Sequence, residues 1–389
     1  MMETLPVELI TNILSRTEGW KERTSLRGVC RIWNDIICYY PWKETLYIST
    51  PLLFPPFYNA QVLSITSELT SELIENITLK YSNLHHVELA MRSDKVPKDR
   101  HLIFSLLGSI PNLKLSIGTA SSWINVEDIK YLSNVVDLDI SFCMNLSNEY
   151  LALLSNVKRI NLSLRNIHYS NDLVTDDGLI HLVNVKEIDL SRRRNITDNG
   201  LSHLTQLKKL IINDCRITGS CFSNFSKLKT LSFKNCNLLQ EDNLSELKSL
   251  TSIDLSNSLS VTNDVLSKLT HVKIVNISQC TGFSGLGLSY LESVEELYLD
   301  KCTQLIDRSL YNLSSSIKVL SLLGCSSITG EFLEYLPNSI ISINIHLCNQ
   351  IKPIHVENFT SKNPKIIVLS KEKLRISLSP NYTQSSKSS

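Results

Sequence analysis

The sequence predicts an α/β solenoid, in which a strand, a turn and a short helix recur along most of the chain, preceded by a small all-helical domain. Three observations support this fold class. Short apolar-x-apolar triplets recur about every 22 residues, a cysteine often follows each triplet at a constant distance, and the interval closes with apolar residues at helical spacing. A unit this short cannot bury its own apolar face, so neighbouring units must stack.

The first 48 residues differ in composition from the rest, because they contain three of the four tryptophans, Trp20, Trp33 and Trp42. The segments from Thr4 to Leu14 and from Leu26 to Ile37 each place apolar residues on one helical stripe. These segments predict two or three short helices. Their core would be small for an independent domain, so we expect it to pack on the first repeats or on a partner.

The triplets follow this segment. The ten regular ones begin at Leu138, Ile160, Ile188, Leu210, Leu231, Ile253, Val275, Leu297, Leu320 and Ile343. Their starts differ by 22, 28, 22, 21, 22, 22, 22, 23 and 23 residues. Less regular triplets begin at Leu63, Val87 and Leu115, and Ile366 continues the phase at the other end. The alternation within each triplet is typical of a short strand.

The cysteines follow the same period. Seven of the ten regular units have a cysteine five positions after the first triplet residue: Cys143, Cys215, Cys236, Cys280, Cys302, Cys325 and Cys348. None of the cysteines forms a CxxC pair, which argues against zinc ribbons. Equivalent positions on parallel strands point their Cβ atoms in the same direction, so we expect buried thiols that pack rather than disulfides. Ser258 interrupts the run and disfavours a linear metal array.

Composition excludes several classes of function. The net charge is +1, with 39 Lys and Arg against 38 Asp and Glu, which argues against a nucleic-acid binder held by bulk charge. There is no run of about 18 apolar residues and no signal-peptide pattern, so we expect a cytoplasmic protein, with the nucleus as the other compartment. No P-loop, HExxH or dinucleotide fingerprint occurs. We therefore expect no catalytic residue, no metal and no cofactor.

The repeat pattern L-x-L-x-x-C-x-x-I-T-D-x-G-L resembles the cysteine-containing class of leucine-rich repeats. The resemblance covers Leu63 to Val368 and is clearest over residues 132–350. It implies a leucine-rich-repeat horseshoe over residues 49–370, with a parallel sheet on the concave side and helices on the convex side. Residues 371–389 are expected to form a strand remnant and a disordered tail.

The N-terminal pattern, Leu5-Pro-x-Glu-Leu-x-x-x-Ile-Leu14 followed by Val29-Cys-Arg-x-Trp33, resembles an F-box, expected over residues 1–48. Thr17 stands where the family usually has an apolar residue. The resemblance implies binding to a Skp-type adaptor, and through it to a cullin–RING ligase. The adaptor-binding positions carried over are Leu5, Pro6, Leu9, Ile13, Leu26, Val29 and Trp33. An alternative is that these residues only form a core that caps the first repeat.

Together, the two resemblances imply the substrate-recognition subunit of an SCF-type E3 ubiquitin ligase, with a protein target on the repeats and no enzymatic activity of its own. Two alternatives stay open: a scaffold or adaptor decoy that delivers no substrate, and a small-molecule receptor with a pocket on the concave face. The candidate substrate-binding residues are Asp139, Asp189, Ile211, Asp254 and Tyr298 on the strands, and Arg192, Arg193 and Arg194 beside the insertion at 166–172.

Overall fold

The structure is a computed structural model that describes residues 45–48, 60–66, 68–89, 96–118, 124–143, 145–164 and 172–370. The predicted F-box up to residue 44, with all seven adaptor-binding positions, lies outside these ranges. So do residues 165–171 of the predicted insertion and the tail 371–389. The chain forms two compact units, unit 1 (Met1–Asp189) and unit 2 (Leu190–Ser389).

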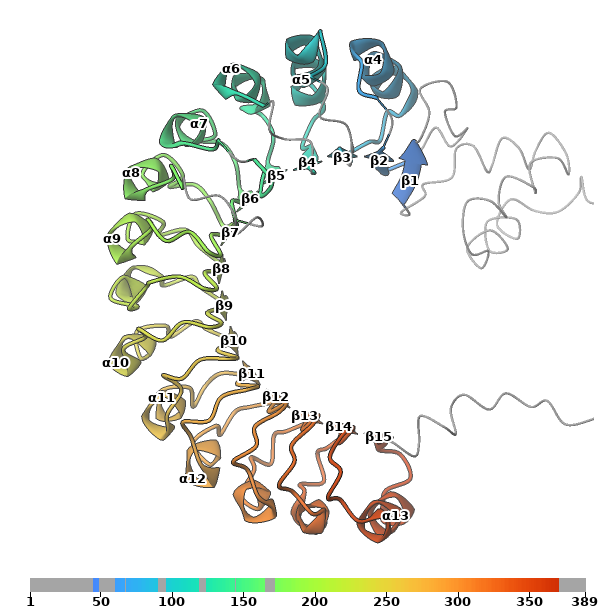
Figure 1. Cartoon of the computed structure of the whole chain (residues 1–389), viewed down its shortest axis with the longest axis vertical. Helices are drawn as coiled ribbons and strands as arrows, with labels where there is room; N and C mark the ends of the chain where they lie inside the picture. The colour runs from blue at the N-terminus through green and yellow to red at the C-terminus, as the bar shows by residue number, and fades with distance from the viewer. Residues whose placement is uncertain are drawn as a thin grey trace, which may run out of the picture. The chain divides into compact units, whose positions relative to one another are not determined.

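The described part of unit 1 is a parallel sheet whose strands pair in chain order. The strands are β1 (Thr45–Ile48), β2 (Val62–Ile65), β3 (His86–Leu89), β4 (Lys114–Ile117), β5 (Asp137–Asp139), β6 (Arg159–Asn161) and β7 (Glu187–Asp189). The helices are α4 (Ser71–Lys80), α5 (Arg100–Gly108), α6 (Val126–Ile129), the 3-10 helix η3 (Lys130–Leu132), α7 (Asn148–Ala152) and α8 (Asp176–Leu179). The helices lie on one side of the strands (Figure 1).

Unit 2 repeats the same arrangement with shorter helices. Its strands are β8 (Lys209–Ile211), β9 (Thr230–Ser232), β10 (Ser252–Asp254), β11 (Ile274–Asn276), β12 (Glu296–Tyr298), β13 (Val319–Ser321), β14 (Ser342–Asn344) and β15 (Ile367–Leu369). Its helices are α9 (Asp198–Leu201), η4 (Phe222–Asn224), α10 (Glu241–Leu244), α11 (Asn263–Ser267), α12 (Gly285–Leu288), η5 (Asp307–Leu310), η6 (Glu331–Tyr335) and α13 (Pro353–Lys362). Neighbouring strands again pair in parallel and in chain order.

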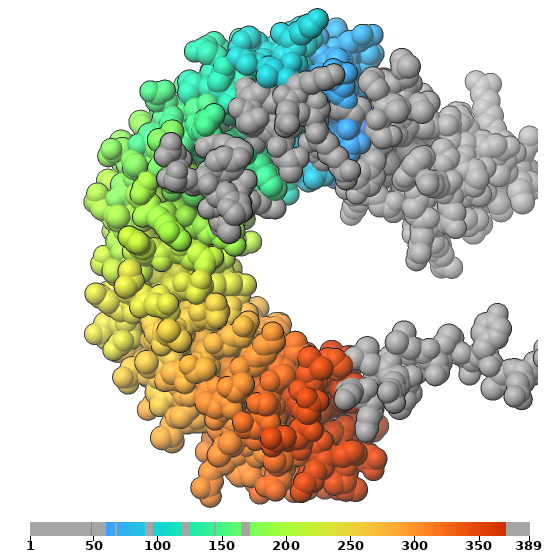
Figure 2. Space-filling view, viewed as in Figure 1, coloured from blue at the N-terminus to red at the C-terminus, as the bar shows by residue number. Residues whose placement is uncertain are grey.

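The core of each unit lies between its strands and its helices. The central residue of a strand is buried, as Leu231, Ile253 and Leu297 show, and so are the leucines of the helical segments, such as Leu266 and Leu288. Successive repeats of unit 2 pack without a break on the face shown in Figure 2. The period of about 22 residues therefore reflects one strand and one helical turn per layer, as the triplets predict.

Threonine side chains cap two of the helices of unit 2. The hydroxyl of Thr197 accepts a hydrogen bond from the amide of Asn199, at 3.2 Å, and the hydroxyl of Thr262 accepts one from Val265, at 3.4 Å. Both threonines precede a helix in extended backbone, so they are N-caps. The capping threonine marks the point in the repeat where the chain turns into the helix.

In unit 2, each turn that connects a strand to the following helical segment contains a residue with left-handed backbone dihedrals. The non-glycine residues with positive φ are Arg192, Asp214, Asn235, Asn257, Gln279, Lys301 and Leu347, and Gly324 takes the same place in one repeat. The amide of each turn residue donates to a carbonyl of the next repeat, as from Lys301 to Leu323 at 2.7 Å. This ladder of turn hydrogen bonds continues the sheet beyond the strands.

Two predicted boundaries differ from the structure. Among the described residues the first strand is β1 from Thr45, which pairs with β2, so strand residues occur before the predicted boundary at 49. At the other end Ile343 pairs with Val368, not with Ile366. The last interval is longer because α13 has ten residues, whereas the preceding helical segments of unit 2 have three to five.

Candidate functional site

The sheet face opposite the helices presents the residues on either side of each buried strand centre. In unit 2 these flanking positions are half-buried in the middle strands except for Ser321, which is buried, whereas Lys209 on β8 and both Ile367 and Leu369 on β15 are exposed. Side chains on alternate strand positions share a face, so this surface is continuous from strand to strand within the unit. It is the surface on which the sequence places the substrate-binding residues.

The acidic residues on this face are engaged by neighbouring groups of the protein. Asp254 accepts a hydrogen bond from the amide of Ser256, at 3.0 Å, through Oδ1. Its other oxygen accepts from the side-chain amide of Asn276, at 3.0 Å, and lies 2.9 Å from Nζ of Lys234. Asp254 therefore closes its own turn and links three repeats, in addition to any contact with a partner.

Asp139 has the same role in unit 1. Its Oδ1 accepts from the amide of Ser141, at 3.0 Å, and its Oδ2 accepts from the side-chain amide of Asn161, at 3.0 Å. Asp189 takes the corresponding position on β7 and is half-buried. The charge of these aspartates predicts binding to a partner, but Asp or Asn two residues before the turn is also a known turn-closing pattern, and this is the role that the structure shows for Asp139 and Asp254.

Tyr298 and Ile211 are the apolar candidates on the face of unit 2. Tyr298 lies on β12 and is half-buried, and its hydroxyl donates to Oε2 of Glu296 at 2.8 Å. Burial and this carboxylate raise the pKa of Tyr298, so the phenol is neutral near pH 7. Ile211 lies on β8, half-buried. The two side chains share a face but lie on strands separated by three others, β9 to β11.

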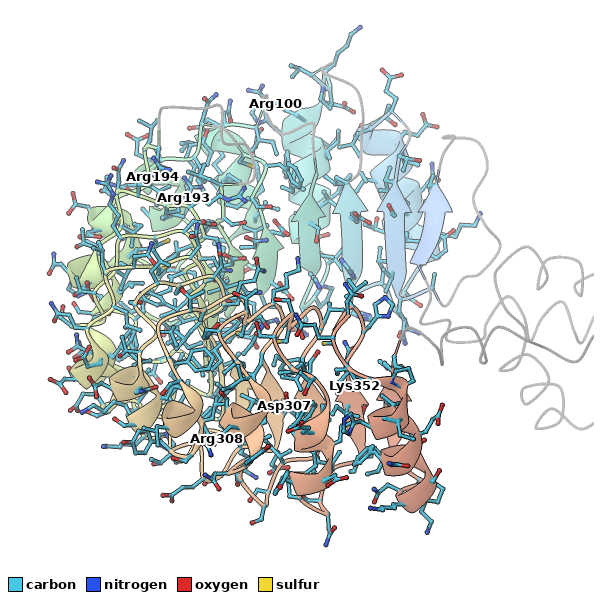
Figure 3. All side chains as sticks on the ribbon, turned by 60° about the horizontal axis from the view of Figure 1, so that its bottom comes forward. Arg100, Arg193, Arg194, Asp307, Arg308 and Lys352 are labelled. Atoms are coloured by element: carbon cyan, nitrogen blue, oxygen red, sulfur yellow. The ribbon has the colours of Figure 1, made fainter. Side chains whose placement is uncertain are left out.

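Of the three arginines that the sequence analysis gives as candidate substrate-binding residues, the middle one is buried. Arg193 is only 2% exposed, and its amide donates to the carbonyl of Leu190 at 3.0 Å. It stands five positions after Ile188, where other repeats have cysteine, so the periodicity directs its side chain into the core. Arg192 and Arg194 are exposed, and Nε of Arg192 lies 3.5 Å from Asp214. Arg193 and Arg194 are labelled in Figure 3. Arg193 is therefore not available for a surface contact.

The comparisons with known proteins identify the fold. No protein-family model and no curated protein matches the chain. Among solved structures, a chain of the mouse RP105/MD-1 complex matches with 15% identity and a TM-score of 0.55, over 82% of this chain and 61% of that one. The described chain has the leucine-rich-repeat fold.

Two further solved structures are similar to this leucine-rich-repeat chain. An internalin from Listeria monocytogenes is 16% identical with a TM-score of 0.49, over 89% of this chain and 93% of that one. Toll in the Drosophila Toll–Spatzle complex is 15% identical with a TM-score of 0.48, over 78% of this chain. The chain spans 47% of the length of that Toll chain.

The cysteines of the leucine-rich repeats form a ladder in the core of unit 2. Each thiol lies within hydrogen-bonding distance of a carbonyl of the preceding repeat, as Cys280 does to Leu255 at 3.3 Å and Cys325 to Leu299 at 3.1 Å. All described cysteines are buried and free, which confirms packing without disulfides. Ser258 takes the same place and its hydroxyl lies 3.4 Å from the carbonyl of Phe233. Serine therefore continues the ladder by the same contact.

We expect the ladder thiols to resist alkylation in the folded protein. Burial raises the pKa of Cys302 and of Cys325 to about 12, so almost no thiolate exists at pH 8. Site-resolved mass spectrometry after iodoacetamide treatment at pH 8 should show these two cysteines unmodified in the native chain and modified in urea. Rapid native labelling at Cys302 would contradict the buried ladder.

A pocket at the C-terminal end of unit 2 bears on the small-molecule alternative. It has a volume of about 270 Å³ and lies between β14 and α13 rather than on the sheet face, lined by residues such as Ile345, Ile351 and Val356. Its lining contains no Lys or Arg, which an anionic ligand would require.

In the residues that the structure describes, no group of three or more His, Cys, Asp or Glu side chains is placed to hold a metal ion. Within the same residues, no helix is both long enough and apolar enough to span a membrane.

Proposed function

We propose that the chain is the substrate-recognition subunit of an SCF-type ubiquitin ligase. The observation that carries the proposal is the combination of a leucine-rich-repeat fold with an F-box-like pattern directly before it, from Leu5 to Trp33. Stacked repeats with an uncovered sheet face are suited to binding a macromolecule. The F-box-like segment would bind a Skp-type adaptor through its apolar helical surface.

The role of such a subunit is proximity. A target held on the repeats would have its lysines at a high effective concentration near the ubiquitin-charged enzyme of the complex. No catalytic group of this chain is needed for that step. The sheet face of unit 2 supplies polar hydrogen-bonding groups, and Tyr298 is an amphipathic side chain of the kind enriched at protein interfaces.

We expect the full chain to bind a purified Skp-type adaptor, and the double variant L5A/P6A to bind at least about tenfold more weakly, because hot-spot apolar residues dominate such interfaces. Isothermal titration calorimetry would measure both affinities. The matched control is Asn12→Ala, which changes the same segment at a polar position that is not among the adaptor-binding residues and should leave the affinity unchanged. If the unmodified chain does not bind the adaptor, the ligase role is wrong.

A second measurement separates a substrate receptor from an adaptor decoy. Proteins crosslinked to the repeats in cells would be identified and then tested for ubiquitin transfer in a reconstituted ligase. The receptor function requires transfer to a bound protein that depends on Leu5 and Pro6. Adaptor binding without transfer to any bound protein would instead indicate the decoy.

A further inference from the structure

The edge of unit 2 at which the strands begin carries one row of stacked residues. Each of them stands two positions before the buried centre of a strand, and its carbonyl accepts the amide of its counterpart in the next repeat. The amide of Lys229 donates to Lys208 at 2.9 Å, and that of Glu295 donates to Lys273 at 2.7 Å. The row consists of Lys208, Lys229, Thr251, Lys273, Glu295, Lys318 and Ile341. Side chains in adjacent members lie about 5 Å apart at their origins.

In the half of this row nearer the C-terminus, a carboxylate balances the charges of the lysines beside it. Glu295 stands between two lysines, with Nζ of Lys273 at 2.8 Å and Nζ of Lys318 at 2.6 Å. Hydrogen bonds from these two ammonium groups lower the pKa of Glu295 to about 2. The carboxylate therefore stays ionised and offsets the charge of its neighbours. Alternating sign is the usual solution when charged side chains stack on adjacent strands.

The other half of the row lacks such a carboxylate. Lys208 and Lys229 are exposed, and so are Lys209 on β8 and Lys227 just before β9. We call these four residues the lysine edge. Lys227 donates to the side-chain carbonyl of Gln206 at 2.6 Å, and none of the four forms an ion pair with a described residue. The side chains of Lys208 and Lys229 start about 5 Å apart, so their like charges repel each other, and a bound anion would relieve that repulsion.

We propose that the lysine edge binds a Glu- and Asp-rich extended segment of another protein. Carboxylates of such a segment would take the place that Glu295 occupies further along the row. Because Glu295 already binds two lysines of this row, at 2.8 and 2.6 Å, a carboxylate is the anion that the spacing of the row is seen to fit. The four residues include no aromatic ring on which a nucleic-acid base could stack, which favours a protein over a single-stranded nucleic acid.

This proposal concerns unit 2 alone and does not depend on adaptor binding, which is measured separately. The probe is a fluorescent synthetic peptide of alternating Glu and Asp, titrated with the full chain and followed by fluorescence anisotropy. The test variant is K208E/K229E. The matched control is K352E/K365E, which reverses two exposed lysines elsewhere in unit 2 that also form no ion pair; Lys352 is labelled in Figure 3. Circular dichroism melts would verify that both variants fold.

We expect the unmodified chain and the control to bind the peptide alike and K208E/K229E to bind at least about tenfold more weakly. Binding should weaken between about 50 and about 200 mM NaCl, and a Gln/Asn peptide of equal length should not bind. Equal affinity of K208E/K229E and the control would overturn the proposal, as would no binding by the unmodified chain. An oligothymidylate of equal charge that bound tenfold more tightly than the peptide would indicate a nucleic-acid site instead.

Discussion

Replacing Asp307 with asparagine is expected to lower the free energy of unfolding of unit 2 by about 3 kcal/mol at pH 7. Asp307 is a buried carboxylate at the start of η5, labelled in Figure 3. Its Oδ2 accepts from the amide and the hydroxyl of Thr329, at 2.7 and 3.1 Å. Its Oδ1 accepts from the amides of Gly330 and Phe332, at 2.9 and 3.0 Å. Asparagine would turn an NH₂ group toward donors and leave them unsatisfied.

The pH dependence of this effect follows from the pKa of the carboxyl group. Burial alone would raise the pKa of Asp307, but the amides of Thr329, Phe332 and Gly330 and the Thr329 hydroxyl outweigh it, and the pKa is lowered from its ordinary value of 3.8. A lowered folded-state pKa means that the stabilisation is fully present above about pH 4 and is lost as the pH falls through the folded-state pKa. The difference between the native chain and D307N should therefore narrow below pH 4.

Urea unfolding, monitored by hydrogen exchange of the amides in η5 and η6, would measure the loss of unfolding free energy at pH 7 and at about pH 3. The control is Asp264→Asn, because Asp264 is an exposed carboxylate in the first turn of α11 and should cost less than about 1 kcal/mol. A loss at Asp307 no larger than that at Asp264, or a difference that grows toward acid pH, would contradict the explanation.

The same carboxylate arrangement recurs at Asp198, in another repeat of unit 2. It accepts from Thr218, Gly219 and Cys221 in the same pattern, with amide distances of 2.9, 2.9 and 3.3 Å. In both cases the threonine and glycine donors belong to an Ile-Thr-Gly sequence whose glycine has a left-handed φ, 91° at Gly219 and 104° at Gly330. An aspartate about 20 residues before Ile-Thr-Gly is thus a sequence signal for a buried carboxylate bridge.

The regular part of the fold could be predicted because each repeat obeys the same local rule. The apolar triplets predicted β8 to β14 in unit 2, and the cysteine spacing predicted the buried ladder. The end of the array could not be placed in this way. The phase of the triplets predicted that Ile366 would be the partner of Ile343, but Val368 is its partner, because the ten residues of α13 lengthen the last interval.

The candidate site was less predictable, since a polar residue on the sheet face can serve the protein or a partner. Charge alone makes Asp139 and Asp254 candidates for binding a partner. In the structure, each carboxylate also accepts a backbone hydrogen bond that closes its own turn. Arg193 was chosen from a run of three arginines, although its place in the period, five residues after Ile188, already predicted burial. The lysine edge could not be predicted from the sequence. Lys208 and Lys229 lie in different repeats and become neighbours only when those repeats stack.

The second large effect is expected in unit 1, at the end of α5. Gly108 is buried there, and a Cβ atom at this position would lie 2.0 Å from the carbonyl oxygen of Tyr131 and 3.0 Å from its carbonyl carbon. Both atoms belong to the backbone of η3, so no side chain can move aside to make room. Ile103, Phe104 and Leu107 of the same helix are fully buried, which prevents α5 from shifting outward.

Gly108→Ala is therefore expected to lower the free energy of unfolding of unit 1 by about 3 kcal/mol, although alanine in an unhindered helix would raise it. Hydrogen exchange of the α5 and η3 amides in the full chain would report the loss locally. The control is Ser105→Ala in the same helix, an exposed position where alanine should be neutral or slightly stabilising. Unchanged protection in G108A would mean that α5 and η3 are not held together as closely as this contact requires, because only a looser packing of the two helices leaves space for a methyl group.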